Sequence, residues 1–357
     1  MRMWDQEDKL QHAMDSMFGV REARADRSVM PFRGIREAYQ VITGDGDCSQ
    51  IPRGGFYLKA QEAWATANFP NVLLNAMTKK LLQDWGENSY NYFDKLVSKT
   101  VVGDFKQQDR VRMGYLPQLS TVAESAAYVE IARPTDELIQ YTVAKYGNLV
   151  TVSEETIRND DLGKMMQIPS RLARAARATL AQYITNFFIN NSTYQPDSTA
   201  WFAAGHNNVA VGALSSATLD TAQQQLQQQT EKDSALPLNF RLDWLMIPPA
   251  LYPTARQINL NPTGTNNWYQ RFGADDENIF VNPLLTDVDD WFVGTWPDQG
   301  PAIEVGFLDG YDIPQIFLAN LPTQGTMFTN DQLQFKMKFV FAGNIVDFRP
   351  VYSGKQD

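Results

Sequence analysis

Residues 156–208 decide the fold. They open with Thr156-Ile157-Arg158-Asn159-Asp160-Asp161-Leu162-Gly163 and close with Trp201-Phe202-Ala203-Ala204-Gly205-His206-Asn207-Asn208. Between these ends, apolar residues recur three and four positions apart, which predicts a helix about 30 Å long with one apolar face. That face consists of Leu172, Ala173, Ala176, Leu180, Ile184, Phe187 and Phe188. We expect sheets to pack against this spine helix.

The start of the spine helix has two sequence signals. The Asp160-Asp161 pair suits a helix start, because carboxylates accept hydrogen bonds from the unpaired amides of the first turn. Pro169 suits the first turn of a new helical segment, where no amide donor is required. These signals predict that a new segment of the helix begins at Pro169.

Composition limits the class of protein. The chain has 357 residues, of which 43% are hydrophobic and 20% charged, as is typical of a globular protein with two or three compact units. Its net charge of -10 argues against a protein built to grip nucleic acid, which would have a basic face. A shell that merely surrounds nucleic acid stays compatible with this charge.

Cys48 is the one cysteine, so no internal disulfide is possible and synthesis in a reducing cytoplasm is expected. The first residues are too charged for a signal peptide. No run of about 18 apolar residues is present, so we expect no membrane span. Leu10, Met14, Met17 and Phe18 predict a short amphipathic helix, either a frayed terminus or an arm that orders against a neighbouring subunit.

Strand periodicity begins after residue 103. Polar and apolar residues alternate in 110–114, 127–131, 139–145 and 149–152, and Tyr146-Gly147-Asn148-Leu149 fits a two-residue hairpin turn. We expect a long β-hairpin over 104–153. Such a hairpin needs a partner to cover its edges, because exposed strand edges promote aggregation.

A separate lobe is predicted over 211–304. It contains a glutamine-rich helix at 217–229, with its polar face solvated, and a buried strand, Trp244 to Ile247, stopped by prolines. After it, Leu333, Phe335, Met337, Phe339 and Phe341 alternate with polar residues, which predicts a long strand with one buried face. The lobe is therefore inserted into the sequence of another domain.

Enzyme chemistry is the competing hypothesis. A hydrolase would have to use His206 with a nearby Ser or carboxylate, but no nucleophile-elbow motif accompanies it, and a loop histidine of this kind usually makes structural hydrogen bonds. Zinc is disfavoured because the chain has only three Cys and His residues in all. The acidic clusters at 160–161, 275–277 and 287–290 are explained by helix caps and solvated loops. We expect no catalytic residue, cofactor or metal.

Several motifs, in order along the chain, resemble the major head subunit of Mu-like phages and prophages. Besides 156–208, they are Phe32 to Tyr39, Ile42 to Asp45, Asn68 to Leu73, Arg110 to Gly114 and Val346 to Tyr352. That family has the α+β Hong Kong 97-type capsid fold. The resemblance implies a shell protein, with an encapsulin-like compartment on the same fold as an alternative.

The resemblance also implies a domain order. It comprises an N-terminal arm (1–60), a peripheral domain in three parts (61–103, 154–210 with the spine helix, and 305–357), an extended loop (104–153) and an axial domain (211–304). Arm and loop would overlap neighbouring subunits, and axial loops would meet at symmetry axes.

Interface residues follow from these expectations. They are Arg33, Arg36, Arg53, Tyr115, Leu116, Gln118, Asn261, Asn266 and Trp268. Arg171, Arg174 and Arg177 lie off the apolar face of the spine helix and are candidates for sequence-independent contact with packaged double-stranded DNA. The expected partners are further copies in pentamers and hexamers, with scaffold, maturation protease, portal and decoration proteins. The expected location is the virion capsid, after synthesis and assembly in the bacterial host cytoplasm.

Overall fold

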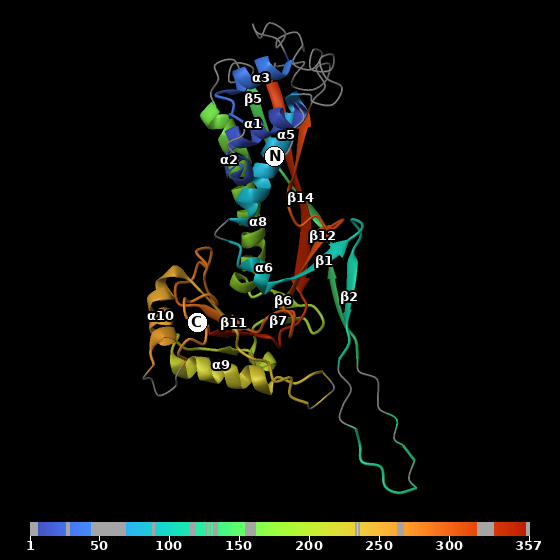
Figure 1. The fold of residues 1–357 in the computed structure, drawn as a ribbon. Helices are drawn as coiled ribbons and strands as arrows, with labels where there is room; N and C mark the ends of the chain where they lie inside the picture. Colours follow the sequence, from blue (N-terminus) through green and yellow to red (C-terminus); the bar gives the residue numbers. More distant parts are fainter. Residues whose placement is uncertain are drawn as a thin grey trace. The chain divides into compact units, whose positions relative to one another are not determined.

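The computed structural model describes residues 6–25, 29–43, 69–87, 90–114, 119–125, 127, 128, 130, 135–153, 162–232, 234, 236–262, 268–319 and 332–354. The chain divides into two compact units (Figure 1). The first comprises Met1–Asn91, Lys145–Thr179 and Tyr311–Val340, and the second Tyr92–Ala144, Leu180–Gly310 and Phe341–Asp357. Helix α8 (Leu162–Ile189) and strand β14 (Gln332–Ile345) each contribute residues to both units.

Helices cluster at the N-terminal end of the first unit. They are α1 (Gln6–Phe18), α2 (Arg21–Ala25), α3 (Ile35–Thr43) and α5 (Phe69–Gly86). Met14 is 0% exposed, and Asp15 accepts from Lys79 of α5 at 2.5 Å. The hypothesis of a frayed terminus is therefore wrong, because the apolar face of α1 is buried in the described fold.

Strand β14 carries the sheet of the first unit. β13 (Gln315–Ala319) and β5 (Leu149–Ser153) both pair with it in antiparallel register, Ile316 opposite Met337 and Val150 opposite Phe335. Phe335, Met337 and Phe339 are buried and Lys336 is exposed, which confirms the predicted alternation.

The hairpin turn expected at Tyr146–Leu149 is not formed. β4 (Ala144–Tyr146) and β5 both pair with β14, so Gly147 and Asn148 interrupt one edge of the sheet instead of reversing the chain. A Cβ on Gly147 would lie 2.3 Å from the Met337 carbonyl oxygen. Glycine is therefore required by a close approach of two backbones, and not by a turn.

The spine helix is longer than predicted at its N-terminal side. α8 begins at Leu162, so Pro169 lies inside the helix and not at the start of a segment. Proline removes one helical hydrogen bond there. The buried face that includes Leu172, Ala173 and Ala176 offsets this cost and keeps the helix continuous.

The second unit has a five-stranded sheet in the order β10 (Ile279–Val281), β9 (Trp244–Ile247), β11 (Trp291–Gly294), β15 (Val351–Gly354) and β8 (Val209–Ala210). Helices α9 (Ser216–Gln228) and α10 (Tyr252–Leu260) lie beside it (Figure 1). Ser215 caps α9 through the Thr218 amide at 3.2 Å. The apolar face of α9, with Leu219, Ala222 and Leu226, belongs to this core.

Two further pairings complete the second unit. β1 (Ser98–Val102), which follows the short helix α6 (Phe93–Leu96) in sequence, runs parallel to β12 (Ile303–Leu308), and β12 pairs antiparallel with the C-terminal end of β14. β2 (Gln108–Arg112) and β3 (Glu137–Tyr141) form a two-stranded ribbon. The shorter elements are β6 (Thr193–Tyr194), β7 (Thr199–Ala200), η1 (Ala204–His206) and η2 (Pro249–Leu251). The strand expected at 127–131 is absent from its described residues, Ala127, Tyr128 and Glu130.

Candidate functional site: the base of the hairpin

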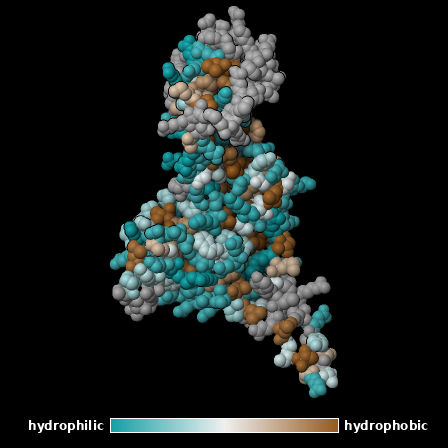
Figure 2. All heavy atoms as spheres, in the orientation of Figure 1, coloured by the Kyte–Doolittle hydropathy of each residue, from teal (hydrophilic) through white to brown (hydrophobic). Residues whose placement is uncertain are grey.

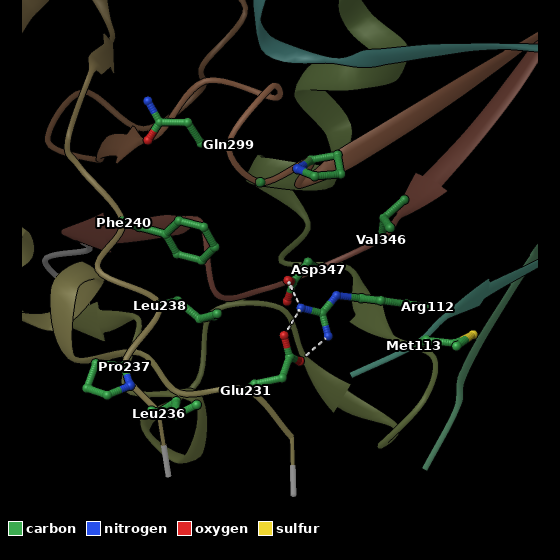
Figure 3. A pocket seen from close by; sticks show the side chains of 12 residues that line it. Arg112, Met113, Glu231, Leu236, Pro237, Leu238, Phe240, Gln299, Val346 and Asp347 are labelled. Carbon is green, nitrogen blue, oxygen red and sulfur yellow. Dashed lines mark hydrogen bonds and ion pairs between the residues drawn. The ribbon is translucent and has the colours of Figure 1, made fainter. Parts of the chain in front are cut away.

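Five charged side chains of the second unit meet at the base of the ribbon that β2 and β3 form. Arg112 is the centre: its guanidinium donates to Glu231 at 2.5 and 2.9 Å in a two-pronged pair. It also donates to Glu137 at 2.9 Å and lies 3.0 Å from Asp347. Figure 3 shows the Arg112 guanidinium held between the carboxylates of Glu231 and Asp347.

Arg349 is the second cation of this cluster. It donates to Asp347 at 2.9 Å and to both oxygens of Glu137 at 3.3 Å, and its Nε donates to the Thr230 carbonyl at 3.0 Å. Its side chain is 4% exposed. Paired, hydrogen-bonded guanidinium groups are the form in which buried cations are tolerated.

The cluster shifts the ionisation of its carboxylates in opposite directions. For Glu137, burial acts to raise the pKa, but Arg349 and Arg112 outweigh it and the pKa lies below its usual value. For Asp347, burial dominates and raises the pKa, although the same two arginines act against it. The cluster therefore responds to acid through more than one group.

A second ion pair holds the ribbon at Arg110, two residues before Arg112 on β2. Arg110 of β2 donates to Glu304 of β12 at 2.7 Å, and the Tyr141 hydroxyl of β3 donates to the same carboxylate oxygen at 2.6 Å. Burial and Glu304 both raise the pKa of Tyr141. Both strands of the ribbon are thus bound to the rest of the second unit twice, once by the ion cluster and once by Glu304.

A hollow of about 620 Å³ lies beside Arg112 (Figure 3). Its other walls are mainly apolar and include Met113, Leu236, Leu238 and Phe240. The Arg112 guanidinium already has carboxylate partners. The hollow therefore offers a ligand apolar surface rather than an unpaired charge.

The ribbon and the residues beyond it expose apolar side chains. Val111 and Leu138 lie directly opposite each other and are 55% and 45% exposed. Met113, Leu119 and Tyr128 are 73%, 87% and 89% exposed. Apolar side chains stand among polar ones along the hairpin tip (Figure 2). Val111 and Leu138 thus form an exposed apolar pair on one face of the ribbon, which suits contact with another surface.

The predicted interface residues fall into three groups. Arg33, Arg36 and Asn261 are described and exposed. Arg53, Tyr115, Leu116, Gln118 and Asn266 lie outside the described residues, as do Cys48 and the Asp160-Asp161 pair. Trp268 was assigned wrongly: it is 6% exposed, belongs to the lobe core, and donates to Asp220 at 3.0 Å.

The three arginines of the spine helix do not act alike. Arg171 and Arg174 are exposed, whereas Arg177 is 3% exposed, so its assignment as DNA-facing is wrong. Its guanidinium lies 4.5 Å from the centre of the Trp85 ring and donates to Asn91 at 2.8 Å. Successive residues of a helix are 100° apart, so the spacing of the apolar residues placed Arg177 at the edge of the buried face. That spacing alone did not decide whether the Arg177 side chain is buried or exposed.

His206 serves structure in the second unit. Its Nδ1 lies 3.0 Å from the Trp201 carbonyl oxygen and its Nε2 2.7 Å from Asp197, while its ring stacks on Phe348 at 3.8 Å. Burial acts to raise the pKa of Asp197, but bonds from His206 and Thr199 lower it overall. Both ring nitrogens are occupied and the ring is 5% exposed, so the hydrolase alternative is not favoured.

Sequence inspection missed the ion cluster, although Arg112, Asp347 and Arg349 lie in quoted motifs. The partners are far apart in sequence, 119 positions for Arg112 and Glu231 and 212 for Arg349 and Glu137, so the sequence held no local signal for their meeting. Among the described residues, no group of three or more His, Cys, Asp or Glu side chains is placed to hold a metal ion. No helix within that part of the chain is long and apolar enough to cross a bilayer.

The fold and this surface define a class of structural protein whose subunits present a projecting hairpin. A family model described as "Phage capsid protein" matches residues 136–353, more than half of the chain, and the chain belongs to that family. It is a phage capsid protein with the expected α+β fold, and it forms the shell of a phage.

Solved structures give weaker likenesses. A chain from Microbacterium phage Oxtober96 is 13% identical with a TM-score of 0.47, covering 73% of this chain and 90% of that one. A chain titled "Capsid of native GTA particle computed with C5 symmetry" is 13% identical with a TM-score of 0.49, covering 75% and 90%. Mycobacterium phage Adephagia provides a third, 15% identical with a TM-score of 0.44, covering 73% and 88%. No curated protein sequence matches the chain.

Proposed function

We propose that this chain is the major head subunit of a Mu-like tailed phage, and that its copies lock into an icosahedral shell through the β2–β3 hairpin. The supporting observation is the combination of an exposed apolar ribbon with a buried ion cluster at its base. Arg112 of β2 pairs with Glu231, and Glu137 of β3 accepts from Arg349, so both strands are anchored to the rest of the second unit at the base of the hairpin. An anchored hairpin suits the repeated head-to-tail contacts of a closed lattice.

The arm (1–60) and extended loop (104–153) overlap neighbouring subunits, the axial domain (211–304) meets its copies in pentamers and hexamers, and the remaining segments form the peripheral domain. The shell assembles in the bacterial host cytoplasm with scaffold, maturation protease, portal and decoration proteins. It encloses double-stranded DNA, and the subunit has no catalytic role.

The test is the mass of the purified full-length chain by light scattering, with negative-stain images of the same sample. Shells, or rings of five and six, are the expected result. A monomer at every protein and salt concentration would contradict self-assembly. The variant Val111→Asp with Leu138→Asp is expected to fold and to lose assembly, because it places charge on the exposed face of the ribbon.

A further inference from the structure

A second hollow, of about 650 Å³, lies in the first unit at the interruption between β4 and β5. Its lining residues are Lys145, Tyr146, Gly147, Asn148, Leu149, Lys336, Met337 and Lys338. We call it the lysine hollow. Its floor is fixed by backbone: the Met337 amide donates to the Asn148 carbonyl at 2.9 Å, and Gly147 has no room for a Cβ against Met337.

The charge of the lysine hollow is unusual for this chain. The whole sequence has 41 acidic and 31 basic residues, yet the hollow has three lysines and no carboxylate among its lining residues. Lys336 and Lys338 are two positions apart on β14, so they point to the same face, away from buried Phe335 and Met337. Coulomb attraction therefore selects an acidic occupant.

Apolar surface adjoins these cations. Lys336 Nζ lies 5.0 Å from the centre of the Phe317 ring, and Phe317 keeps 40% of its surface exposed. Leu149 is 61% exposed. A partner that suits this face combines carboxylates with an aromatic or aliphatic side chain.

The tip of the hairpin has that combination. From 113 to 136 the sequence contains Glu124, Glu130 and Asp136 but one basic residue, Arg133. Glu124 and Glu130 are exposed, and Tyr128 lies between them in sequence with 89% of its surface exposed. The tip therefore presents two carboxylates and an aromatic ring to a partner.

We propose that the lysine hollow receives the Glu124–Glu130 tip of the hairpin from a second copy of this chain. Glu124 and Glu130 pair with Lys336 and Lys338, and Tyr128 packs against Phe317 and Leu149. This docking rests on the proposed function and specifies which surface accepts the hairpin. It makes the contact head-to-tail, since tip and hollow are different surfaces.

The test is a charge swap in the full-length chain, read as the yield of shells or rings at low salt. Lys336→Glu with Lys338→Glu, and separately Glu124→Lys with Glu130→Lys, are each expected to reduce the yield at least tenfold. The fourfold variant is expected to recover most of it, because the pairs are restored with reversed sign. Lys95→Glu, an exposed lysine outside the hollow, the arm and the extended loop, is the control and is expected to assemble normally.

The outcomes separate this docking from the general function. If wild type assembles and both reversed pairs assemble equally well, the docking is wrong and the shell function stands. Folded double variants that fail without rescue in the fourfold variant also overturn it. If only the lysine variant changes, and it loses bound DNA instead of assembly, the occupant is nucleic acid and the proposal is wrong. Failure of wild type itself to assemble counts against the proposed function.

Discussion

Arg112 and Glu231 are 119 positions apart in sequence, yet they form a two-pronged ion pair with bonds of 2.5 and 2.9 Å. The pair binds the end of β2 to the segment that follows α9. With Glu137, Asp347 and Arg349 it forms a buried cluster of three acids and two bases. The hairpin therefore depends on an electrostatic contact for its position.

Arg112→Ala is expected to destabilise the second unit by about 3–5 kcal/mol, because it leaves buried carboxylates without their main counter-charge. Arg112→Lys is expected to recover only part of the loss, since an ammonium group cannot make the two-pronged contact with Glu231. Urea unfolding measures both. Arg171→Ala, an exposed arginine, is the control and should stay within about 0.5 kcal/mol of wild type. Equal stability of Arg112→Ala and wild type would refute the role given to the cluster.

Acid is expected to weaken the cluster through Glu137. Its folded-state pKa lies below the usual 4.5, so its contribution is complete above that pH and is lost as pH falls through the lowered value. Asp347 acts in the opposite sense, because its pKa is raised and its protonation relieves buried charge. Glu137→Gln should therefore be less stable at neutral pH, and should lose less stability than wild type on acidification below about pH 4.5. Parallel stability curves for the two proteins would rule out this assignment.

Much of the fold could be predicted from periodicity. The spine helix and the alternation of β14 follow from apolar spacing, because burial of one face fixes the phase of a helix or strand. The β9 strand ends at Ile247, directly before Pro248, as expected, since proline cannot continue a ladder.

The failures come from tertiary context. Gly147 has turn chemistry in its sequence, but pairing of both flanking strands with β14 keeps the chain extended. Trp268 stands beside a polar loop, but its indole fills the lobe core with Phe272, at 5.9 Å between ring centres. The ion cluster joins segments far apart in sequence, and no local pattern predicts such a meeting.

His206→Ala is expected to lower stability by about 3 kcal/mol, because it removes a buried ring stacked on Phe348 and leaves the Trp201 carbonyl without its imidazole partner. Thermal unfolding measures the loss. Asp197→Asn should have a smaller effect, since the Asp197 side chain is 42% exposed. A variant that unfolded like wild type but lost a measurable hydrolytic activity would revive the enzyme hypothesis.

The three arginines of α8 should separate into two behaviours. Arg177→Ala is expected to cost about 3 kcal/mol of stability, because it removes a buried cation from Trp85 and from Asn91. Arg171→Ala with Arg174→Ala should leave unfolding unchanged. If these two contact packaged DNA, purified particles of the double variant should release DNA at lower salt than wild-type particles, because each phosphate contact contributes to the salt dependence. Identical release curves would exclude Arg171 and Arg174 as DNA contacts and assign both to the solvated face of the helix.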